Sequence, residues 1–133
     1  RMRPHDGRVV SNFCIQALDG TPLTVYGDGT QTRSFSYVAD TVDGIVRLLF
    51  SSEVDPVNIG NPTEFTIAGL LATLEAVLGH PLPVTYAPLP QDDPRVRQPD
   101  ITRATTLLGW TPQTDLATGL RATLEWFRER KIA

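Results

Sequence analysis

Apolar residues spaced for helices alternate along this chain with short runs suited only to brief strands. The helical spacing covers residues 9–18, 38–49, 67–78, 101–108 and 116–127. The strand-like runs are residues 23–26, 56–62 and 82–88, each with glycine or proline at its ends. Helices that alternate with a few short strands predict an α/β fold, or an α+β-like fold with a small sheet.

Polar residues and glycines predict where several of these helices begin and end. Thr66, Asp100 and Asp115 each precede a helical run and can accept a hydrogen bond from an exposed backbone N–H. Gly79 and Gly109 follow two of the runs and can adopt the left-handed conformation that ends a helix. The helix over 101–108 is expected to turn its apolar residues inward: Ile101, Ala104, Leu107 and Leu108.

Three short strands that lie far apart in the chain leave edges or faces that something must cover. A length of 133 residues fits one domain rather than two. We therefore expect one unit, residues 1–133, whose fold is completed by parts outside it. The first residue is Arg1 rather than methionine, so we also expect a longer parent chain.

Charge and composition exclude several classes of function. The formal net charge is −3 and the basic residues are scattered, which argues against a nucleic-acid-binding face. No apolar run approaches the roughly 20 residues of a membrane span. The single cysteine, Cys14, allows neither an internal disulfide nor a cysteine-built zinc site, and its apolar helix neighbours predict a core residue. We expect a cytoplasmic protein that binds neither nucleic acid nor membrane.

Few residues of this chain are suited to catalysis. His5 and His80 lie in loops without the neighbours of a catalytic triad and are expected at the surface. Asp92 and Asp93 lie in a proline-flanked loop without a third ligand, so we expect solvated side chains and no metal. Eleven of the twelve basic residues are arginine, and the only lysine, Lys131, lies near the C-terminal end. The sequence therefore predicts no catalytic residue in this chain.

Two arginines are better candidates for ligand binding. Arg33 lies between a strand and a helix, and Arg97 lies in the proline-bounded stretch 92–100. A guanidinium presents a planar fork to phosphate oxygens and stays charged at working pH, so two such loops could clamp a diphosphate. From spacing alone, exposed salt bridges explain these arginines better. The glycines of 27–29 lack the third glycine and the following helix of a dinucleotide-binding turn.

Four segments together resemble a known family: RMRPHDGRVVSNF, LTVYGDGTQTRSFSYVAD, VNIGNP and QDDPRVRQPDI…LLGW. In order and interval they are similar to the C-terminal part of the extended short-chain dehydrogenases/reductases that modify nucleotide sugars, the NAD-dependent epimerase/dehydratase family. The motifs DGRVVSNF and DDP..R.PDI resemble those of the UDP-glucuronate decarboxylase (UDP-xylose synthase) branch. The dTDP-glucose 4,6-dehydratases and UDP-sugar 4-epimerases share the YG.G.Q.R pattern and stay open as alternatives.

The resemblance implies a nucleotide-sugar site and a role for each matching residue. In the family the arginine of the Q-x-R motif, here Arg33, contacts the diphosphate, and the aromatic residue of the YG pair, here Tyr26, lies by the base. Val9 and Thr24 match positions that line the base pocket, and Asn58 matches a position that contacts the nucleotide sugar. The full implied set is Arg8, Val9, Thr24, Tyr26, Arg33, Asn58 and Arg97 for the substrate, with Arg3 and Arg8 at the cofactor.

The resemblance also implies parts that this sequence does not contain. Relatives carry a Gly-rich NAD-binding turn on a Rossmann sheet and a catalytic Tyr-x-x-x-Lys pair. The tyrosines here are followed four residues later by other types: Tyr26 by Thr30, Tyr37 by Thr41 and Tyr86 by Pro90. For an intact enzyme the resemblance implies hydride transfer from sugar C4 to NAD, loss of CO2 from the 4-keto intermediate, and return of the hydride. UDP-glucuronate would thus become UDP-xylose.

This chain alone is expected to bind a UDP-sugar and to be inactive, with NAD bound mainly by an N-terminal Rossmann half outside it. The alternative from another class is a stand-alone, non-catalytic module that binds nucleotide sugars or a protein. In relatives the helices that match 9–18 and 38–49 pack near the Rossmann half. We therefore expect their apolar faces to be exposed here and to favour a homo-oligomer.

Overall fold

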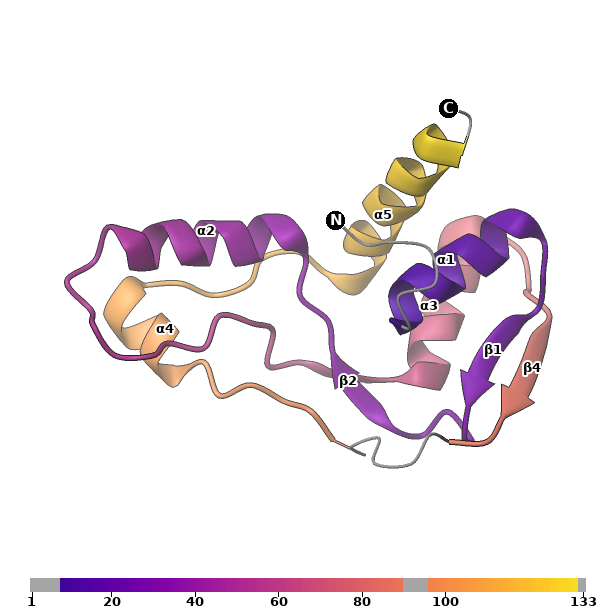
Figure 1. Ribbon diagram of the computed structural model, residues 1–133, viewed down its shortest axis with the longest axis horizontal. Coiled ribbons are helices and arrows are strands. Elements are labelled where there is room, and N and C mark those ends of the chain that lie inside the picture. The colour runs from indigo at the N-terminus through magenta and orange to yellow at the C-terminus, as the bar shows by residue number, and fades with distance from the viewer. Residues whose placement is uncertain (1–7, 90–95, 132–133) are drawn as a thin grey trace.

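The computed structural model describes residues 8–89 and 96–131 and has a mixed α/β architecture (Figure 1). Within these residues the helices are α1 Val9–Asp19, α2 Val38–Leu49, α3 Ile67–Leu78, α4 Thr102–Leu108 and α5 Leu116–Lys131. The strands are β1 Leu23–Tyr26, β2 Thr32–Ser34, β3 Glu64–Thr66 and β4 Val84–Ala87. All five helices predicted from apolar spacing are present, and the predicted fold class is confirmed.

The strands form two small sheets rather than one. β1 pairs in parallel with β4, and Leu23 lies opposite Val84. β2 pairs with β3 in the antiparallel sense, and Arg33 lies opposite Phe65. Each sheet has two strands within the described residues, so each leaves open edges.

The strand predicted over residues 56–62 is wrong. This segment is irregular, and its polar groups bond to another loop instead of to a strand. The Asn58 side chain donates to the Asp100 carbonyl at 3.0 Å, and the Pro62 carbonyl accepts from the Gln98 side chain at 2.7 Å. The sequence does not predict β2 and β3, because three-residue strands of mostly polar residues show no clear alternation.

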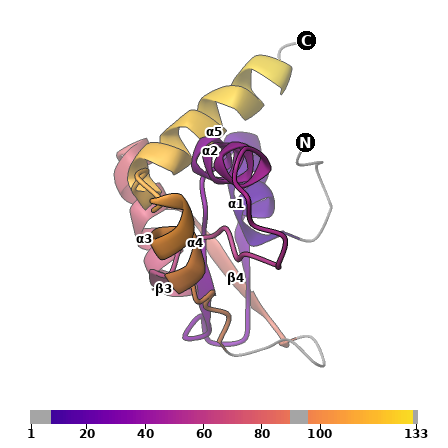
Figure 2. The ribbon, with the colours of Figure 1, turned by 90° about the vertical axis from the view of Figure 1, so that its left-hand side faces the viewer.

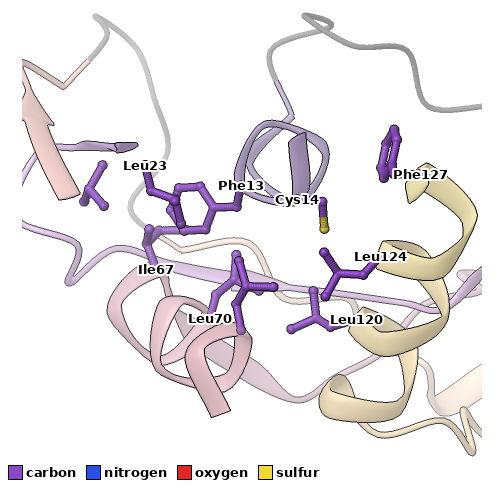
Figure 3. Packing of buried hydrophobic residues seen from close by; sticks show 10 residues of the cluster. Phe13, Cys14, Leu23, Ile67, Leu70, Leu120, Leu124 and Phe127 are labelled. Atoms are coloured by element: carbon purple, nitrogen blue, oxygen red, sulfur yellow. The ribbon is translucent and has the colours of Figure 1, made fainter. Parts of the chain in front are cut away.

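One hydrophobic core joins α1, α3, α5 and β1, and Figure 3 shows its side chains meeting between the helices. The buried members are Phe13, Cys14, Leu23, Val25, Ile67, Leu70, Leu74, Leu120, Leu124 and Phe127. Cys14 has no exposed surface, and burial raises the pKa of its thiol to about 12. The thiol is therefore protonated at neutral pH, which fits the predicted core role. We call α1, α3, α5, β1 and β4 the core lobe.

Side-chain caps begin two helices of the core lobe where the sequence predicts them. Thr66 Oγ1 accepts a hydrogen bond from the Gly69 N–H at 2.9 Å at the start of α3. Asp115 Oδ1 accepts from the Thr118 N–H at 2.9 Å at the start of α5. Gly79 ends α3 with a φ of 79°, in the left-handed region that favours glycine.

The start of α4 differs from the prediction by one residue. Ile101 is the cap position, and Asp100 accepts the Thr102 N–H at 2.8 Å from one place further out. Ala104 is buried as expected, whereas Leu107 is 50% exposed, so its predicted inward direction is wrong. α4 has only seven residues and packs against α2 on one side, which leaves its other face in solvent.

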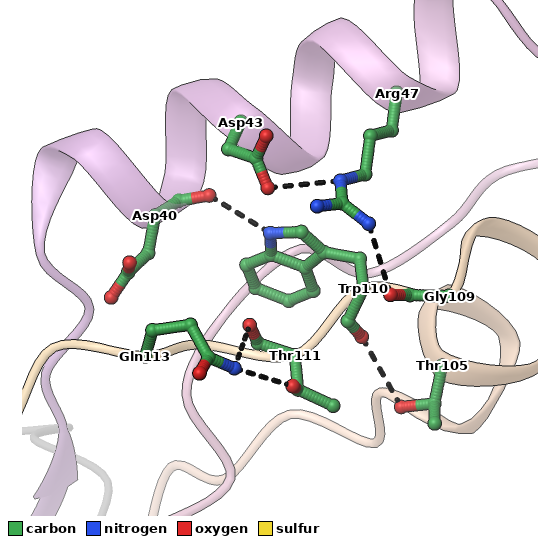
Figure 4. Close-up of polar contacts among 8 residues, drawn as sticks. All are labelled: Asp40, Asp43, Arg47, Thr105, Gly109, Trp110, Thr111 and Gln113. Atoms are coloured by element: carbon green, nitrogen blue, oxygen red, sulfur yellow. Dashed lines mark hydrogen bonds and ion pairs between the residues drawn. The ribbon is translucent and has the colours of Figure 1, made fainter.

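α2 and α4 lie to one side of the core lobe, and we call them, with residues 109–114, the α2–α4 layer (Figures 1 and 2). Trp110 is 1% exposed and donates from Nε1 to the Asp40 carbonyl at 3.0 Å (Figure 4). α2 approaches closely at Gly44, where a Cβ atom would lie 2.6 Å from Ile59 Cγ2 and 2.9 Å from Trp110 Cε2. Trp110 therefore holds the layer together where α2 has no side chain.

The outer face of α2 is apolar and exposed, as predicted for 38–49. Its exposed residues, continuing just past the end of the helix, are Val38, Val42, Ile45, Val46, Leu49 and Phe50. The same prediction for 9–18 is wrong, because Phe13 and Cys14 of α1 are buried. α1 packs against β1 and α5 and so covers its own apolar face.

Candidate nucleotide-sugar site

Arg33 lies in the middle of β2, on a strand rather than in the loop that the sequence predicts. The residue is half-buried, and its Nη1 donates to the Thr32 carbonyl at 2.7 Å. Beside it, the rings of Phe35 and Phe65 stack with centroids 6.3 Å apart. Pairing of β2 with β3 fixes the backbone of Arg33 and puts Phe65 opposite it.

The segment that carries Arg97 runs alongside β2. Ser34 Oγ donates to the Arg97 carbonyl at 2.9 Å, which joins the residue after Arg33 to the second predicted arginine. On its other side this segment meets residues 58–62, where Pro99 Cγ would lie 3.1 Å from a Cβ at Gly60. Three predicted site residues, Arg33, Asn58 and Arg97, thus belong to three segments that touch one another.

Thr24 and Tyr26 lie on the opposite face of β1 from the core. Leu23 and Val25 are buried, whereas Thr24 is half-buried and Tyr26 is 43% exposed, the alternation expected of a strand. The Gln16 side chain of α1 bonds to Thr24 twice. The sequence analysis misses Gln16, because a lone polar residue on a helix gives no signal of its partner.

An ordered turn connects these β1 residues with Arg33. Gly27 and Gly29 have φ values of 67° and 79°, and Asp28 accepts from both the N–H and the hydroxyl of Thr30. The Gln31 side chain donates back to the Tyr26 carbonyl at 2.7 Å. A strand rather than a helix follows this turn, so it does not form the phosphate cradle that a dinucleotide-binding turn needs.

Arg8 and Val9 lie at the start of α1. Arg8 is exposed at the cap position, and its carbonyl accepts from the Asn12 N–H and the Ser11 hydroxyl, both at 3.0 Å. Val9 is half-buried and packs against the core. Arg3 lies outside the described residues, as do His5, Asp92 and Asp93. His80 is exposed, as predicted.

Two hollows occur near the 96–100 segment. One of about 520 Å³ is lined by Pro62, Thr105, Thr106 and 98–102, and one of about 650 Å³ is lined mainly by 61–63 and 111–117. Neither of these two contains a predicted site residue. Hydrogen bonds from Thr102 lower the pKa of Asp100 at the rim of the first.

Groups of three or more His, Cys, Asp or Glu placed to hold a metal ion do not occur within 8–89 and 96–131. In the same residues no helix is both long and apolar enough to cross a membrane.

The model of the NAD dependent epimerase/dehydratase family matches residues 1–60. The chain is 48% identical over 130 residues to UDP-glucuronic acid decarboxylase 2 of Arabidopsis thaliana, covering 98% of the chain and 29% of that protein. It is also 48% identical to UDP-glucuronic acid decarboxylase 1 of Danio rerio, covering 96% and 30%. The chain thus spans about a third of the length of these curated relatives.

Solved structures show similarity to the same family. UDP-glucuronic acid 4-epimerase from Bacillus cereus, in complex with UDP-glucuronic acid and NAD, superposes with a TM-score of 0.90 at 30% identity, over 98% of this chain and 42% of that one. These matches place the chain in the NAD-dependent epimerase/dehydratase family, where it corresponds to the C-terminal part of longer members. Within the family it is similar to the UDP-glucuronic acid decarboxylases.

Proposed function

We propose that this chain is the nucleotide-sugar-binding part of an NAD-dependent UDP-glucuronate decarboxylase-like enzyme of the cytoplasm. In the proposal residues 1–133 form a C-terminal substrate-binding unit, and a Rossmann half outside them binds NAD. Identity of 48% to two UDP-glucuronic acid decarboxylases supports the substrate. The chain alone is inactive in this proposal, because its sequence contains no Tyr-x-x-x-Lys pair.

The observation that carries the proposal is the contact between Ser34 and Arg97. This hydrogen bond of 2.9 Å brings the loop of the second arginine to the strand of the first. Two guanidinium-bearing segments side by side suit a ligand with two adjacent phosphate groups. Asn58 comes from the third touching segment and would contact the sugar, while Tyr26 at the far end of the turn would lie by the base.

The described residues do not by themselves fit NAD. The turn at 27–29 offers no phosphate cradle, and Gly27 gives its N–H to the Ala87 carbonyl at 2.9 Å. Arg8 is the one described residue to which we assign a cofactor contact. The work of this chain is then to bind the UDP-sugar and to hold its reacting carbon in place, a contribution that depends on orientation.

Calorimetric titration of the chain with UDP tests the proposal. Arg33→Ala is expected to weaken binding at least tenfold, since it removes a charged hydrogen-bond donor from the phosphates. Arg128→Ala is the matched control, because it removes the same charge from an exposed position on α5. If the folded wild-type chain binds no UDP, or if both variants bind as the wild type does, the proposed site in this chain is wrong.

Two alternative functions are distinguished by other measurements. Relatives of known structure include 4-epimerases and an NDP-hexosamine 5,6-dehydratase, so the parent enzyme could epimerise or dehydrate its sugar. Its product from UDP-glucuronate decides: UDP-xylose with CO2 supports decarboxylation, and UDP-galacturonate supports epimerisation. A stand-alone nucleotide-sugar or protein-binding module would require a coding frame without the Gly-rich turn and the Tyr-x-x-x-Lys pair.

The proposal includes a homo-oligomer. The outer face of α2 exposes Leu49 by 73% and Phe50 by 83%, and contiguous apolar surface of this kind favours association.

A further inference from the structure

The open edge of β1 is occupied by a side chain instead of a strand. On the side of β1 that faces β4, the Leu23 N–H donates to the Pro83 carbonyl at 2.8 Å. The N–H of Gly27, just past the end of β1, donates to the Ala87 carbonyl at 2.9 Å. Backbone groups alternate in direction along a strand, so the N–H of Thr24 points away from β4. It meets the Oε1 atom of Gln16 at 3.1 Å.

Gln16 makes a second bond to the same residue. Its Nε2 atom donates to Thr24 Oγ1 at 3.0 Å. The orientation of this amide is fixed, because a backbone N–H can only donate and so requires the amide oxygen. The NH2 group must then face the Thr24 hydroxyl, and the hydroxyl must accept.

This geometry decides which hydrogen-bonding role the Thr24 hydroxyl can offer to a ligand. A hydroxyl has one hydrogen and two lone pairs, and here Gln16 occupies a lone pair. The hydrogen is therefore directed away from Gln16, and within the described residues it has no protein acceptor. Thr24 shares its face of β1 with the half-exposed ring of Tyr26, so the donor lies beside a flat stacking surface.

We propose that Gln16 is a positioning residue that holds the Thr24 hydroxyl as a hydrogen-bond donor to the base of the bound nucleotide. The inference rests on the proposed function, in which the base lies by Tyr26, and on the base-pocket position that the family resemblance implies for Thr24. The ligand atom facing Thr24 is then an acceptor, such as a pyrimidine carbonyl oxygen. Gln16 itself acts only through Thr24 and does not touch the ligand.

Gln16→Glu should reverse the direction of the hydrogen bond with the Thr24 hydroxyl while keeping both contacts to Thr24. A carboxylate has only acceptor oxygens, so it keeps the bond from the Thr24 N–H and turns the hydroxyl hydrogen toward itself. UDP binding should weaken about tenfold, as for the loss of one hydrogen bond. Thr24→Val, which removes the hydroxyl at nearly constant shape, should weaken UDP binding by a similar factor. The double variant should bind no more weakly than Thr24→Val alone.

Thr21→Glu is the control for added charge, because it places a carboxylate at an exposed position near Gln16. The Thr21 hydroxyl bond to the Gln16 carbonyl is lost in this variant, but the backbone N–H of residue 21 keeps its bond to the same carbonyl at 3.0 Å. It should leave UDP binding unchanged, and circular dichroism melting should show that every variant is folded. Binding by Gln16→Glu at the wild-type level would overturn the inference while leaving the proposed UDP site intact. A further loss in the double variant, or an equal loss in Thr21→Glu, would also overturn it. A folded wild type that binds no UDP would overturn both the proposed function and this inference.

Discussion

The core lobe and the α2–α4 layer bury their apolar residues to very different extents. In the core lobe every residue of the cluster is at most 6% exposed, whereas the apolar residues on the outer face of α2 are 44% to 83% exposed. Both regions have helices with good apolar spacing, so spacing alone does not determine burial. The difference teaches that the core lobe buries its apolar cluster within the described residues, while the layer leaves an apolar helix face exposed.

The predicted binding residues follow this division. Thr24, Tyr26 and Val9 belong to the core lobe, while Asn58 and Arg97 lie in loops that reach toward the α2–α4 layer. β2, the strand that carries Arg33, lies between the two regions (Figure 1). A ligand held by all of these residues would depend on both regions, so the comparison between them bears on function as well as on stability.

The largest effect is expected from Phe13→Ala in the core lobe. Phe13 is 1% exposed at the centre of the cluster, and truncating a buried phenylalanine costs about 3–5 kcal/mol of unfolding free energy. Denaturant unfolding followed by circular dichroism measures the loss. Phe50→Ala, at an 83% exposed position, is the control and should change stability by less than about 0.5 kcal/mol. Equal losses would show that the two regions do not differ as described.

The next largest effect is expected from Gly44→Val in the α2–α4 layer. Added atoms would collide with Ile59 and Trp110, and overpacking typically costs about 1–3 kcal/mol. The two regions share few packing contacts, so Trp110 should become more exposed while core-lobe amides keep their protection from hydrogen exchange. Loss of protection at Leu74 or Leu124 would contradict this separation and show that the layer and the core lobe unfold together.

A smaller effect on stability is expected from replacing Asp115, which caps the start of α5. This helix begins where the core lobe and the α2–α4 layer join. Hydrogen bonds from the backbone and side chain of Thr118 lower the pKa of Asp115. A carboxyl group with a lower pKa in the folded state stabilises the fold above its unfolded pKa, and this contribution is lost as the pH falls through the folded pKa. Asp115→Ala should lower Tm at pH 7, and its difference from the wild type should shrink below about pH 4. Asp115→Asn, a cap without this titration, is the control.

The smallest effect on stability, but a clear effect on assembly, is expected from Leu49→Lys. Leu49 is 73% exposed, so the folded monomer should lose less than about 0.5 kcal/mol. A charge in the apolar outer face of α2 should reduce self-association, measured by light scattering over a range of concentration. A wild type that stays monomeric at high concentration would contradict the proposed homo-oligomer.

The sequence predicts elements whose signals are local. The five helices follow from apolar spacing, and the caps Thr66 and Asp115 follow from polar residues at the right place. Prediction fails where the partner is distant. Residues 56–62 have a strand-like composition, but the 96–100 segment takes their hydrogen bonds. β2 and β3 form only because two mostly polar three-residue segments, distant in the sequence, pair with each other.

The candidate site, too, is predicted from the sequence only in part. Resemblance to a family supplies Arg33, Asn58 and Arg97, but no pattern in the sequence shows that their segments touch. The bond from Ser34 to the Arg97 carbonyl appears only once the chain is folded. Gln16 has no signal at all, since its importance depends on a pair of hydrogen bonds to a strand eight residues away.

The pairing of β1 with β4 has a consequence for how this chain folds during synthesis. In the sequence β2, α2, β3 and α3 all lie between the two paired strands, and α5, the last helix, supplies Leu120, Leu124 and Phe127 to the core. Contacts between parts so distant in sequence slow folding, because the intervening chain must be ordered first. The core lobe can close only when nearly the whole chain has left the ribosome. Until then its apolar residues are exposed to solvent and can bind chaperones or aggregate.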